Sequence, residues 1–268
     1  EMIYEIKKVE KNKKDYTVYF QINQKEESYN VSDEIILDYR LVKGKILEDD
    51  KYAEFKEAVL HDHYRQKLWH YTTYKPRSIQ EARQYLDQFD VPEAAKAKYI
   101  EKLKEAHILD DELYVKNYIE EYSSFRMIGP RKIEMDLRNK GISINQINRM
   151  MGLYKESLMK ENIKHLLEKK VKSSKNKPLF KLKESIKAYL INKGYDYEMV
   201  NQLVDEMSSD IKEGNDEDMA LQKDFDQYLN KYKRSNQSQS FRDYLIPKLM
   251  QKGYPYHKII KFIEGENL

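Results

Sequence analysis

The sequence predicts a mainly α-helical protein, with tandem three-helix-bundle repeats in an elongated, curved array behind a small N-terminal antiparallel β-rich unit. Three observations predict this class. Residues 1–31 alternate apolar and polar side chains with a period of two, which is typical of strands. The segments after residue 48 have helical spacing instead. A short signature, Leu-x-x-Lys-Gly, occurs three times, and such self-similarity is typical of repeat architectures.

The composition excludes several kinds of protein. The 268 residues are 40% hydrophobic and 35% charged, which suits helical assemblies with much solvated surface. The absence of cysteine excludes disulfides, thiolate metal sites and cysteine nucleophiles. No apolar run approaches the roughly 18 residues of a membrane span, and the first residues lack the apolar core of a signal peptide. We therefore expect a cytoplasmic protein that contacts no membrane.

The net charge of +3 hides an uneven distribution. Residues 125–190 carry 17 Lys and Arg against 6 Asp and Glu, a local charge of +11. Residues 191–230 carry 3 against 11, a local charge of −8, and residues 231–268 carry 8 against 3, a local charge of +5. Such blocks indicate a basic surface for a polyanion or for an acidic protein face, with solvated helix faces as the alternative.

The N-terminal unit is assigned to residues 1–47. Its alternating segments predict two or three short antiparallel strands, followed by a short helix that Ser32 caps and Gly44 breaks. Residues 52–74 then predict one long helix, the first of the helical repeats. Its apolar side is expected to hold four side chains: Phe55, Val59, Leu68 and Trp69.

The repeated signature predicts a particular helix end. Lys in the last turn complements the helix dipole, and Gly adopts the left-handed conformation that ends the helix. The residue after Gly should lock the turn, and apolar residues three and six positions after Gly should start the stripe of the next helix. The three glycines are Gly141, Gly194 and Gly253. The expected stripe residues are Ile144, Tyr197 and Tyr256 at the third position, and Ile147, Val200 and Ile259 at the sixth.

Another amphipathic helix precedes each of these pairs, so the repeat unit has three helices. In the first such unit its stripe is expected to hold Tyr114, Tyr118, Tyr122 and Phe125. A diverged copy lies upstream and has Phe89-Asp90 in place of Lys-Gly. One repeat has too little core to stand alone, so neighbours should stack. The predicted repeats span residues 48–109, 110–155, 156–213 and 214–268.

Few residues could carry chemistry. The sequence contains no phosphate-binding glycine motif and no catalytic motif. His61, His63 and His70 form the densest candidate metal cluster, but helical spacing directs His61 elsewhere, which favours polar helix surface. The pair Asp110-Asp111 precedes a helix, so we expect capping instead of acid–base catalysis or magnesium binding. We therefore expect no enzymatic activity, no cofactor and no metal.

A basic cluster is the best candidate for partner binding. Its members flank one turn between two helices, where phosphates or an acidic protein face would find several cations. The 23 tyrosines could also stack on bases, but most lie at helical spacing with Leu and Ile, which favours packing. The candidate residues are Arg126, Arg131, Lys132, Arg138 and Lys140.

Residues 103–151 resemble the RecX family, the bacterial regulators of the RecA recombinase. The match follows one order of residues across a repeat junction: Leu103, Ile108-Leu109-Asp110-Asp111, Leu113-Tyr114, Tyr118, Arg126, Gly129-Pro130, Ile133, Leu137 and Lys140-Gly141-Ile142. The β-rich front and the extra terminal repeat resemble the longer Gram-positive members, so the resemblance covers nearly the whole chain. Three departures concern local geometry. His107 stands where the family commonly has glycine, the first repeat lacks the Lys-Gly helix end, and the fourth repeat matches more loosely.

The resemblance implies a function. Members of the family are tandem three-helix repeats that bind the RecA–single-stranded DNA filament along its groove. They inhibit strand exchange and ATP hydrolysis in DNA repair, by blocking filament extension or promoting disassembly, and have no catalytic activity. The chain is therefore expected to be a monomeric, non-enzymatic RecA modulator. The alternative is a helical-repeat protein that binds nucleic acid directly, and contact with single-stranded DNA would fit both.

Overall fold

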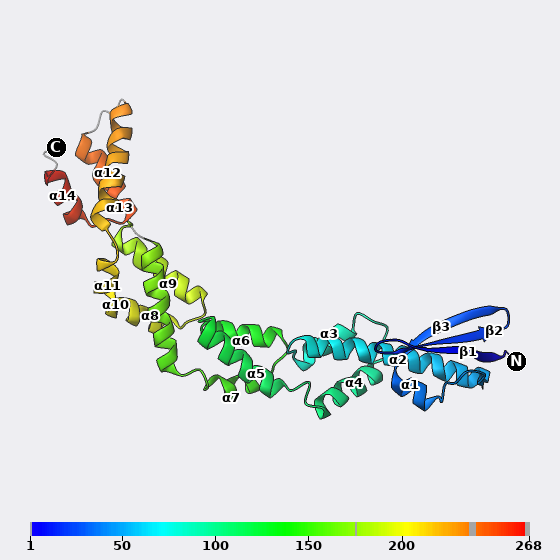
Figure 1. Cartoon of the computed structure of the whole chain (residues 1–268). Coiled ribbons are helices and arrows are strands. Elements are labelled where there is room, and N and C mark those ends of the chain that lie inside the picture. The colour runs from blue at the N-terminus through cyan, green and yellow to red at the C-terminus, as the bar shows by residue number, and fades with distance from the viewer. Residues whose placement is uncertain (1, 175, 236–239, 266–268) are drawn as a thin grey trace. The chain divides into compact units, whose positions relative to one another are not determined.

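The computed structural model describes residues 2–174, 176–235 and 240–265. It divides into two compact units, residues 1–114 and 115–268, and each is described by itself. Figure 1 shows the helices and the single sheet near the N-terminus. The predicted class, a helical protein with a small N-terminal antiparallel sheet, is confirmed. The division into one β-rich unit and four repeats at the predicted residue limits stays a prediction.

The first unit begins with a four-stranded antiparallel sheet in the order β3-β2-β1-β4. Its strands are β1 (Tyr4–Lys11), β2 (Tyr16–Ile22), β3 (Lys25–Val31) and β4 (Ile46–Leu47). The sequence predicted at most three strands. The fourth has only two residues, which pair with Tyr4 and Glu5 of β1. A segment of that length is too short for its alternation to be recognised.

One face of the sheet packs on the start of α2 (Asp49–Tyr74). Ile6, Val18 and Phe20 are fully buried, and the Phe20 ring lies 5.1 Å from that of Phe55 on α2, measured between centroids. The short helix α1 (Asp33–Asp38) begins as predicted, because the Ser32 hydroxyl accepts the amide of Ile35. It ends at Asp38, so the prediction that Gly44 breaks it was wrong. Gly44 lies in the following turn with φ +84°.

The far end of α2 forms a second core with α3 (Ile79–Leu86) and α4 (Glu93–Glu105). Leu68, Leu86 and Leu109 are buried there. Trp69 was predicted to share this core, but its side chain is 50% exposed. Successive residues of a helix point about 100° apart, so a helix that turns Leu68 fully inward directs Trp69 away.

The remaining elements are helical and follow in groups of three. They are α5 (Asp111–Glu120) with a π-helical turn (Glu121–Phe125), α6 (Pro130–Asn139), α7 (Ile144–Met151), α8 (Glu156–Ser173), α9 (Leu179–Asn192), α10 (Tyr197–Glu206), the short α11 (Ser208–Glu213), α12 (Glu217–Arg234), α13 (Phe241–Lys252) and α14 (Tyr256–Gly265). In the group of α12, α13 and α14 the core is apolar, with Phe225, Leu245 and Ile259 buried.

The repeated glycines adopt the predicted left-handed conformation. Their φ angles are +79° at Gly141, +95° at Gly194 and +105° at Gly253. The residues directly after them and those six positions after them are buried as expected, namely Ile142, Tyr195, Tyr254, Ile147, Val200 and Ile259.

The stripe residues three positions after each glycine are exposed, which contradicts the prediction. Ile144, Tyr197 and Tyr256 are 42%, 59% and 57% exposed. Each is the first residue of its helix. Helical side chains lean toward the preceding turn, and the first residue has no preceding turn to lean on. Helical spacing alone therefore overestimates the burial of this position.

Phe125 is 80% exposed, so its predicted place in the stripe of the preceding helix was also wrong. The helix widens into a π-helical turn at Glu121–Phe125, where the amide of Arg126 donates to the Glu121 carbonyl five residues earlier. Because this hydrogen bond spans five residues and not the four of an α-helix, the side chains after it no longer follow the α-helical spacing. Val115 and Ile119 are the buried residues of this helix, while the rings of Tyr118 and Tyr122 stack on each other.

Substituting Gly141 with Ala should destabilise the unit that contains it. Alanine in the left-handed region costs about 1–2 kcal/mol. Gly152 is a matched control because its φ is −60° and a Cβ there meets nothing within 4 Å. Gly152→Ala should leave stability unchanged or raise it by up to about 1 kcal/mol. Urea unfolding followed by circular dichroism measures both, and equal midpoints for the two variants would contradict this reading of Gly141.

Candidate functional site

The pair Asp110-Asp111 joins two helical groups. One oxygen of Asp110 accepts the amides of Glu112 and Leu113 at 2.9 and 3.0 Å, which confirms the predicted cap of α5. Asp111 accepts the amide of Ile79, the first residue of α3, at 2.8 Å. Burial raises the pKa of Asp111. The turn before this pair contains His107 at φ +54°, a conformation that glycine adopts more easily.

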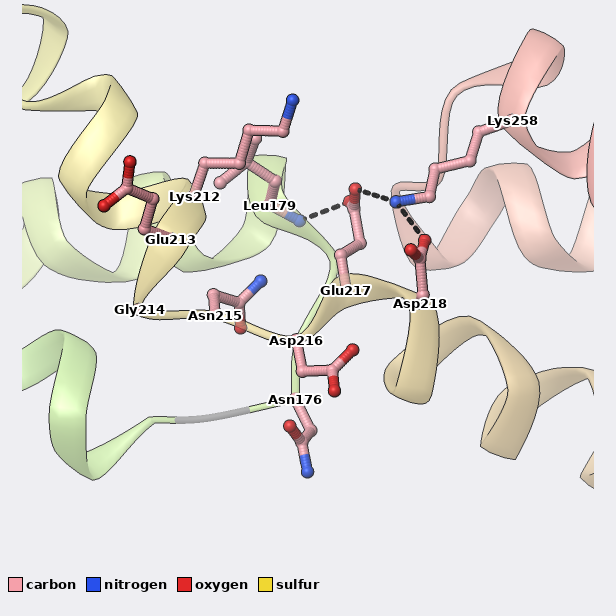
Figure 2. A pocket seen from close by; sticks show the side chains of 10 residues that line it. All are labelled: Asn176, Leu179, Lys212, Glu213, Gly214, Asn215, Asp216, Glu217, Asp218 and Lys258. Carbon is pink, nitrogen blue, oxygen red and sulfur yellow. Dashed lines mark hydrogen bonds and ion pairs between the residues drawn. The ribbon is translucent and has the colours of Figure 1, made fainter.

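A carboxylate makes the same kind of contact between α12 and α9. Glu217, the first residue of α12, accepts the amide of Leu179, the first residue of α9, at 2.7 Å. Figure 2 shows its other oxygen facing Lys258, whose ammonium also contacts Asp218, both at 2.7 Å. The ion pair with Lys258 lowers the pKa of Asp218. These paired groups hold three helices together, so the pocket in Figure 2 is a structural junction.

The start of α6 and the end of α9 meet backbone to backbone, and we call this contact the Gly129–Gly194 joint. The amide of Gly129 donates to the Lys193 carbonyl at 2.8 Å, and the amide of Arg131 donates to the Gly194 carbonyl at 3.1 Å. Helix starts have amides without partners, and helix ends have carbonyls without partners. The two ends satisfy each other here. Pro130, between the two donors, has no amide to satisfy.

Glycine is required on both sides of the Gly129–Gly194 joint. A Cβ on Gly129 would lie 2.2 Å from the Gly194 carbonyl carbon, which is backbone. A Cβ on Gly194 would lie 2.6 Å from the Cβ of Lys132. Gly253 occupies the corresponding place against α9, where a Cβ would lie 3.1 Å from Lys181. The glycine that ends a helix therefore allows close approach to the previous group. Gly194 at the end of α9 meets the start of α6, and Gly253 at the end of α13 meets the start of α9.

A buried chain of hydrogen bonds supports the Gly129–Gly194 joint. The Tyr195 hydroxyl donates to the Met127 carbonyl at 2.9 Å, so Tyr154, 3.2 Å away, donates to Tyr195. Asn162 donates to the Tyr154 hydroxyl at 2.9 Å and to the Ser123 carbonyl at 2.8 Å. Burial raises the pKa of both tyrosines, which keeps them protonated as donors. The chain fixes the segment before α6, where Met127 has the unusual φ of +49°.

Three of the five candidate cations lie at this joint. The Arg126 guanidinium lies over the Tyr122 ring, 4.9 Å from its centroid, and pairs with Glu121 at 2.9 Å. Its hydrogen bond with Glu121 raises the pKa of Arg126. Arg131 pairs with Asp196, the N-cap of α10. Lys132 is exposed and forms no ion pair within the described part of the chain.

The other two cations lie at the opposite end of α6, so the expectation that all five flank one turn was wrong. Arg138 is near Glu134 at 3.7 Å, and Lys140 is the C-cap residue of α6. The ten residues of α6 separate the two ends by roughly 15 Å. Arg131 and Arg138 still line one surface groove, together with Glu134 and Met135. The cations thus follow α6 along its length.

The remaining candidate residues take structural places. Leu109, Gly129, Ile133 and Leu137, which belong to the segment that resembles RecX, are buried. His61 contacts the Tyr99 hydroxyl, while His63 and His70 are exposed. Within the described ranges, no group of three His, Asp or Glu side chains could hold a metal ion. The search of these ranges for a helix able to span a membrane also found none.

Sequence reasoning missed the buried polar chain. Tyr154 and Asn162 had been given no role, and Tyr195 had been expected only to lock a turn. Only Tyr195 directly follows a repeated glycine; Tyr154 lies between α7 and α8, and Asn162 lies on α8, so no local pattern marked them as a set. The described residues define a class of protein: tandem three-helix groups whose buried polar side chains join neighbouring groups and support an exposed, cation-bearing helix.

Comparison with known proteins shows similarity to one family. Residues 110–151 match the family model of the second three-helix domain of RecX, and residues 160–204 match that of the third. The regulatory protein RecX of Oceanobacillus iheyensis is 26% identical over 258 residues, covering 95% of this chain and 94% of that protein. That of Staphylococcus aureus is 28% identical over 266 residues, covering 98% and 96%. The chain is therefore similar to RecX proteins along nearly its whole length, and two of its three-helix segments match RecX domains.

Solved structures share the fold. A crystal structure of regulatory protein RecX has a TM-score of 0.58 at 24% identity, covering 75% of this chain and 99% of that chain. A crystal structure of RecX from Lactobacillus salivarius has a TM-score of 0.51 at 24% identity, covering 55% and 96%. The relatives are named as regulatory proteins and not as enzymes.

Removing the hydroxyl of Tyr195 should destabilise the Gly129–Gly194 joint. Tyr195→Phe leaves the Met127 carbonyl without its donor and Tyr154 without its acceptor, at a cost of about 1–3 kcal/mol. Tyr197→Phe is the matched control, because Tyr197 is 59% exposed and its change should stay within about 0.5 kcal/mol. Urea unfolding of the two variants measures the difference. Equal stability would mean that the hydroxyl chain does not support the joint.

Proposed function

We propose that the chain is a non-enzymatic modulator of RecA that binds the RecA–single-stranded DNA filament along its groove. In this proposal it limits ATP hydrolysis, strand exchange and filament extension. The observation that carries the proposal is the match of two successive domains to RecX, within relatives that align along nearly the whole chain. The partner itself comes from the family resemblance.

The arrangement of the helical groups supports binding to a periodic partner. Groups in a row offer several similar contacts, and once one contact has formed the others are favoured by effective concentration. Affinity then needs no deep pocket. The contacts at the Gly129–Gly194 joint also fix neighbouring groups to each other, so less conformational freedom is lost on binding.

We propose that the filament contacts the cations along α6. Arg126, Arg131, Lys132 and Arg138 are exposed, and the ion pairs that three of them form are exposed too. Surface ion pairs contribute little stability, so these cations can exchange their partners for acidic groups at small cost. Lys140 would extend the same surface. Binding through them should weaken with salt, because screening acts on exposed charges.

The test is the DNA-dependent ATPase of a cognate RecA filament with the chain titrated in. Arg126→Glu, Arg131→Glu and Lys132→Glu together should weaken inhibition at least tenfold, while helicity by circular dichroism is unchanged. The control triple Lys98→Glu, Lys102→Glu and Lys223→Glu changes the net charge equally at exposed positions of α4 and α12. If the wild-type chain neither inhibits nor binds the filament at stoichiometric amounts, the proposed function fails. Equal inhibition by both triples would exclude only the α6 surface.

Exchanging the charges of Arg131 and Asp196 distinguishes two roles of Arg131, contact with the filament and the ion pair with Asp196. Arg131→Glu removes the cation and also repels Asp196. The double variant Arg131→Glu with Asp196→Lys restores an ion pair of opposite polarity without changing the net charge. If Arg131 contacts the filament, the double variant should inhibit as weakly as Arg131→Glu, whereas Asp196→Lys alone, which also removes the N-cap of α10, should inhibit like the wild type. Recovery of inhibition in the double variant would assign Arg131 a structural role only.

A further inference from the structure

A second charged groove lies in the unit of residues 1–114, apart from the cations of α6. It runs along one face of α2, between the turn that joins β1 to β2 and the helix α1, and has a volume of about 690 Å³. Its lining residues are Lys14, Glu34, Asp62, His63, Arg65, Gln66, Lys67, Trp69 and His70.

Trp69 is the aromatic element of this groove. Its side chain is 50% exposed, and its ring contacts no other aromatic ring within the described residues. The backbone beneath it is fixed, because the Thr73 hydroxyl donates to the Trp69 carbonyl at 2.7 Å and the Thr72 hydroxyl donates to the Leu68 carbonyl at 2.9 Å. The buried neighbour Leu68 also anchors the helix to the core. The groove therefore has a flat indole on a rigid support.

The carboxylates of the groove are already occupied. Asp62 accepts Arg65 at one oxygen and Gln66 at the other, both at 2.9 Å. Arg65 also pairs with Glu34 at 3.3 Å. These contacts leave neither acid free to hold a cationic ligand strongly.

The lysines beside the groove are less engaged. Lys13 and Lys14 in the turn between β1 and β2 are exposed and form no ion pair within the described ranges. The Lys67 ammonium lies over the Phe89 ring, 5.3 Å from its centroid, and pairs with no carboxylate there. Lys14, Arg65 and Lys67 line the groove together with two carboxylates that are themselves paired, and Lys13 is the neighbour of Lys14 in the turn. The charge therefore favours an anionic ligand.

We propose that this groove binds single-stranded nucleic acid, with one base stacked on Trp69 and the adjacent phosphates on Lys13, Lys14 and Lys67. A positively charged groove with an exposed aromatic ring is the combination that single strands use, because every base has a face to stack. Duplex bases are stacked on one another and do not reach such a ring. The lining is polar except for Trp69, which favours a nucleic acid over an apolar peptide. This site does not depend on contact with RecA.

The fluorescence of Trp69 reports whether the groove is occupied, because Trp69 is the only tryptophan of the chain. Titrating the full chain with oligothymidylate, without RecA, should quench the tryptophan emission, and added NaCl should reverse the quenching. A duplex of the same length should quench less at equal nucleotide concentration. Absence of quenching at low salt would overturn the proposal. Quenching by polyglutamate to the same degree would overturn it as well, in favour of an acidic protein partner.

Variants identify the contact through the anisotropy of a labelled oligothymidylate. Trp69→Ala should weaken binding by about five- to a hundredfold, the ratio that stacking of one base supplies, and Trp69→Phe should retain part of it. Lys13→Glu with Lys14→Glu should weaken binding and reduce its salt dependence. Tyr74→Ala is the matched control on the same helix, since Tyr74 is 84% exposed and lies outside the groove. Equal affinity of Trp69→Ala and Tyr74→Ala would overturn the assignment, whatever the RecA assay shows.

Discussion

The second unit depends on one constraint, the pairing of helix ends across neighbouring groups. At the Gly129–Gly194 joint, two carbonyls at the end of α9 accept two amides at the start of α6. This contact is possible only where the backbones approach without a Cβ between them, which explains a glycine on each side. Buried amides and carbonyls without partners would be costly, so the position of α6 follows from the helix end that satisfies it. The paired helix ends therefore also determine where the cations of α6 lie.

Much of this fold could be predicted because it depends on local backbone requirements. A left-handed residue after a helix nearly requires glycine, so Gly141, Gly194 and Gly253 marked three helix ends correctly. The failures occurred where burial depends on more than spacing. Tyr197 is the first residue of its helix, and Phe125 follows a change of helical register that no periodic pattern records. Trp69 was assigned to the core because apolarity was taken as burial.

The contacts at the candidate site were harder to predict from the sequence than the helix ends. The sequence indicated basic residues around Gly129-Pro130, but could not indicate which of them are paired. Arg131 and Asp196 are 65 positions apart, and their contact exists only because α6 and α9 meet. The chain from Asn162 through Tyr154 and Tyr195 to Met127 is likewise formed by distant segments. Each of these residues has an ordinary alternative role in a helix, so local patterns did not distinguish them.

The polar chain and the paired helix ends also bear on how such a protein could recognise a long partner. Apolar packing alone tolerates small shifts between groups, whereas hydrogen bonds require defined distances and angles. Buried polar groups that are fully satisfied favour one arrangement over others. The group of α5 to α7 is thereby held at a fixed offset from the group of α8 to α10. A fixed offset lets contacts on successive groups match a repeating partner at once, and without it each further contact would require new ordering.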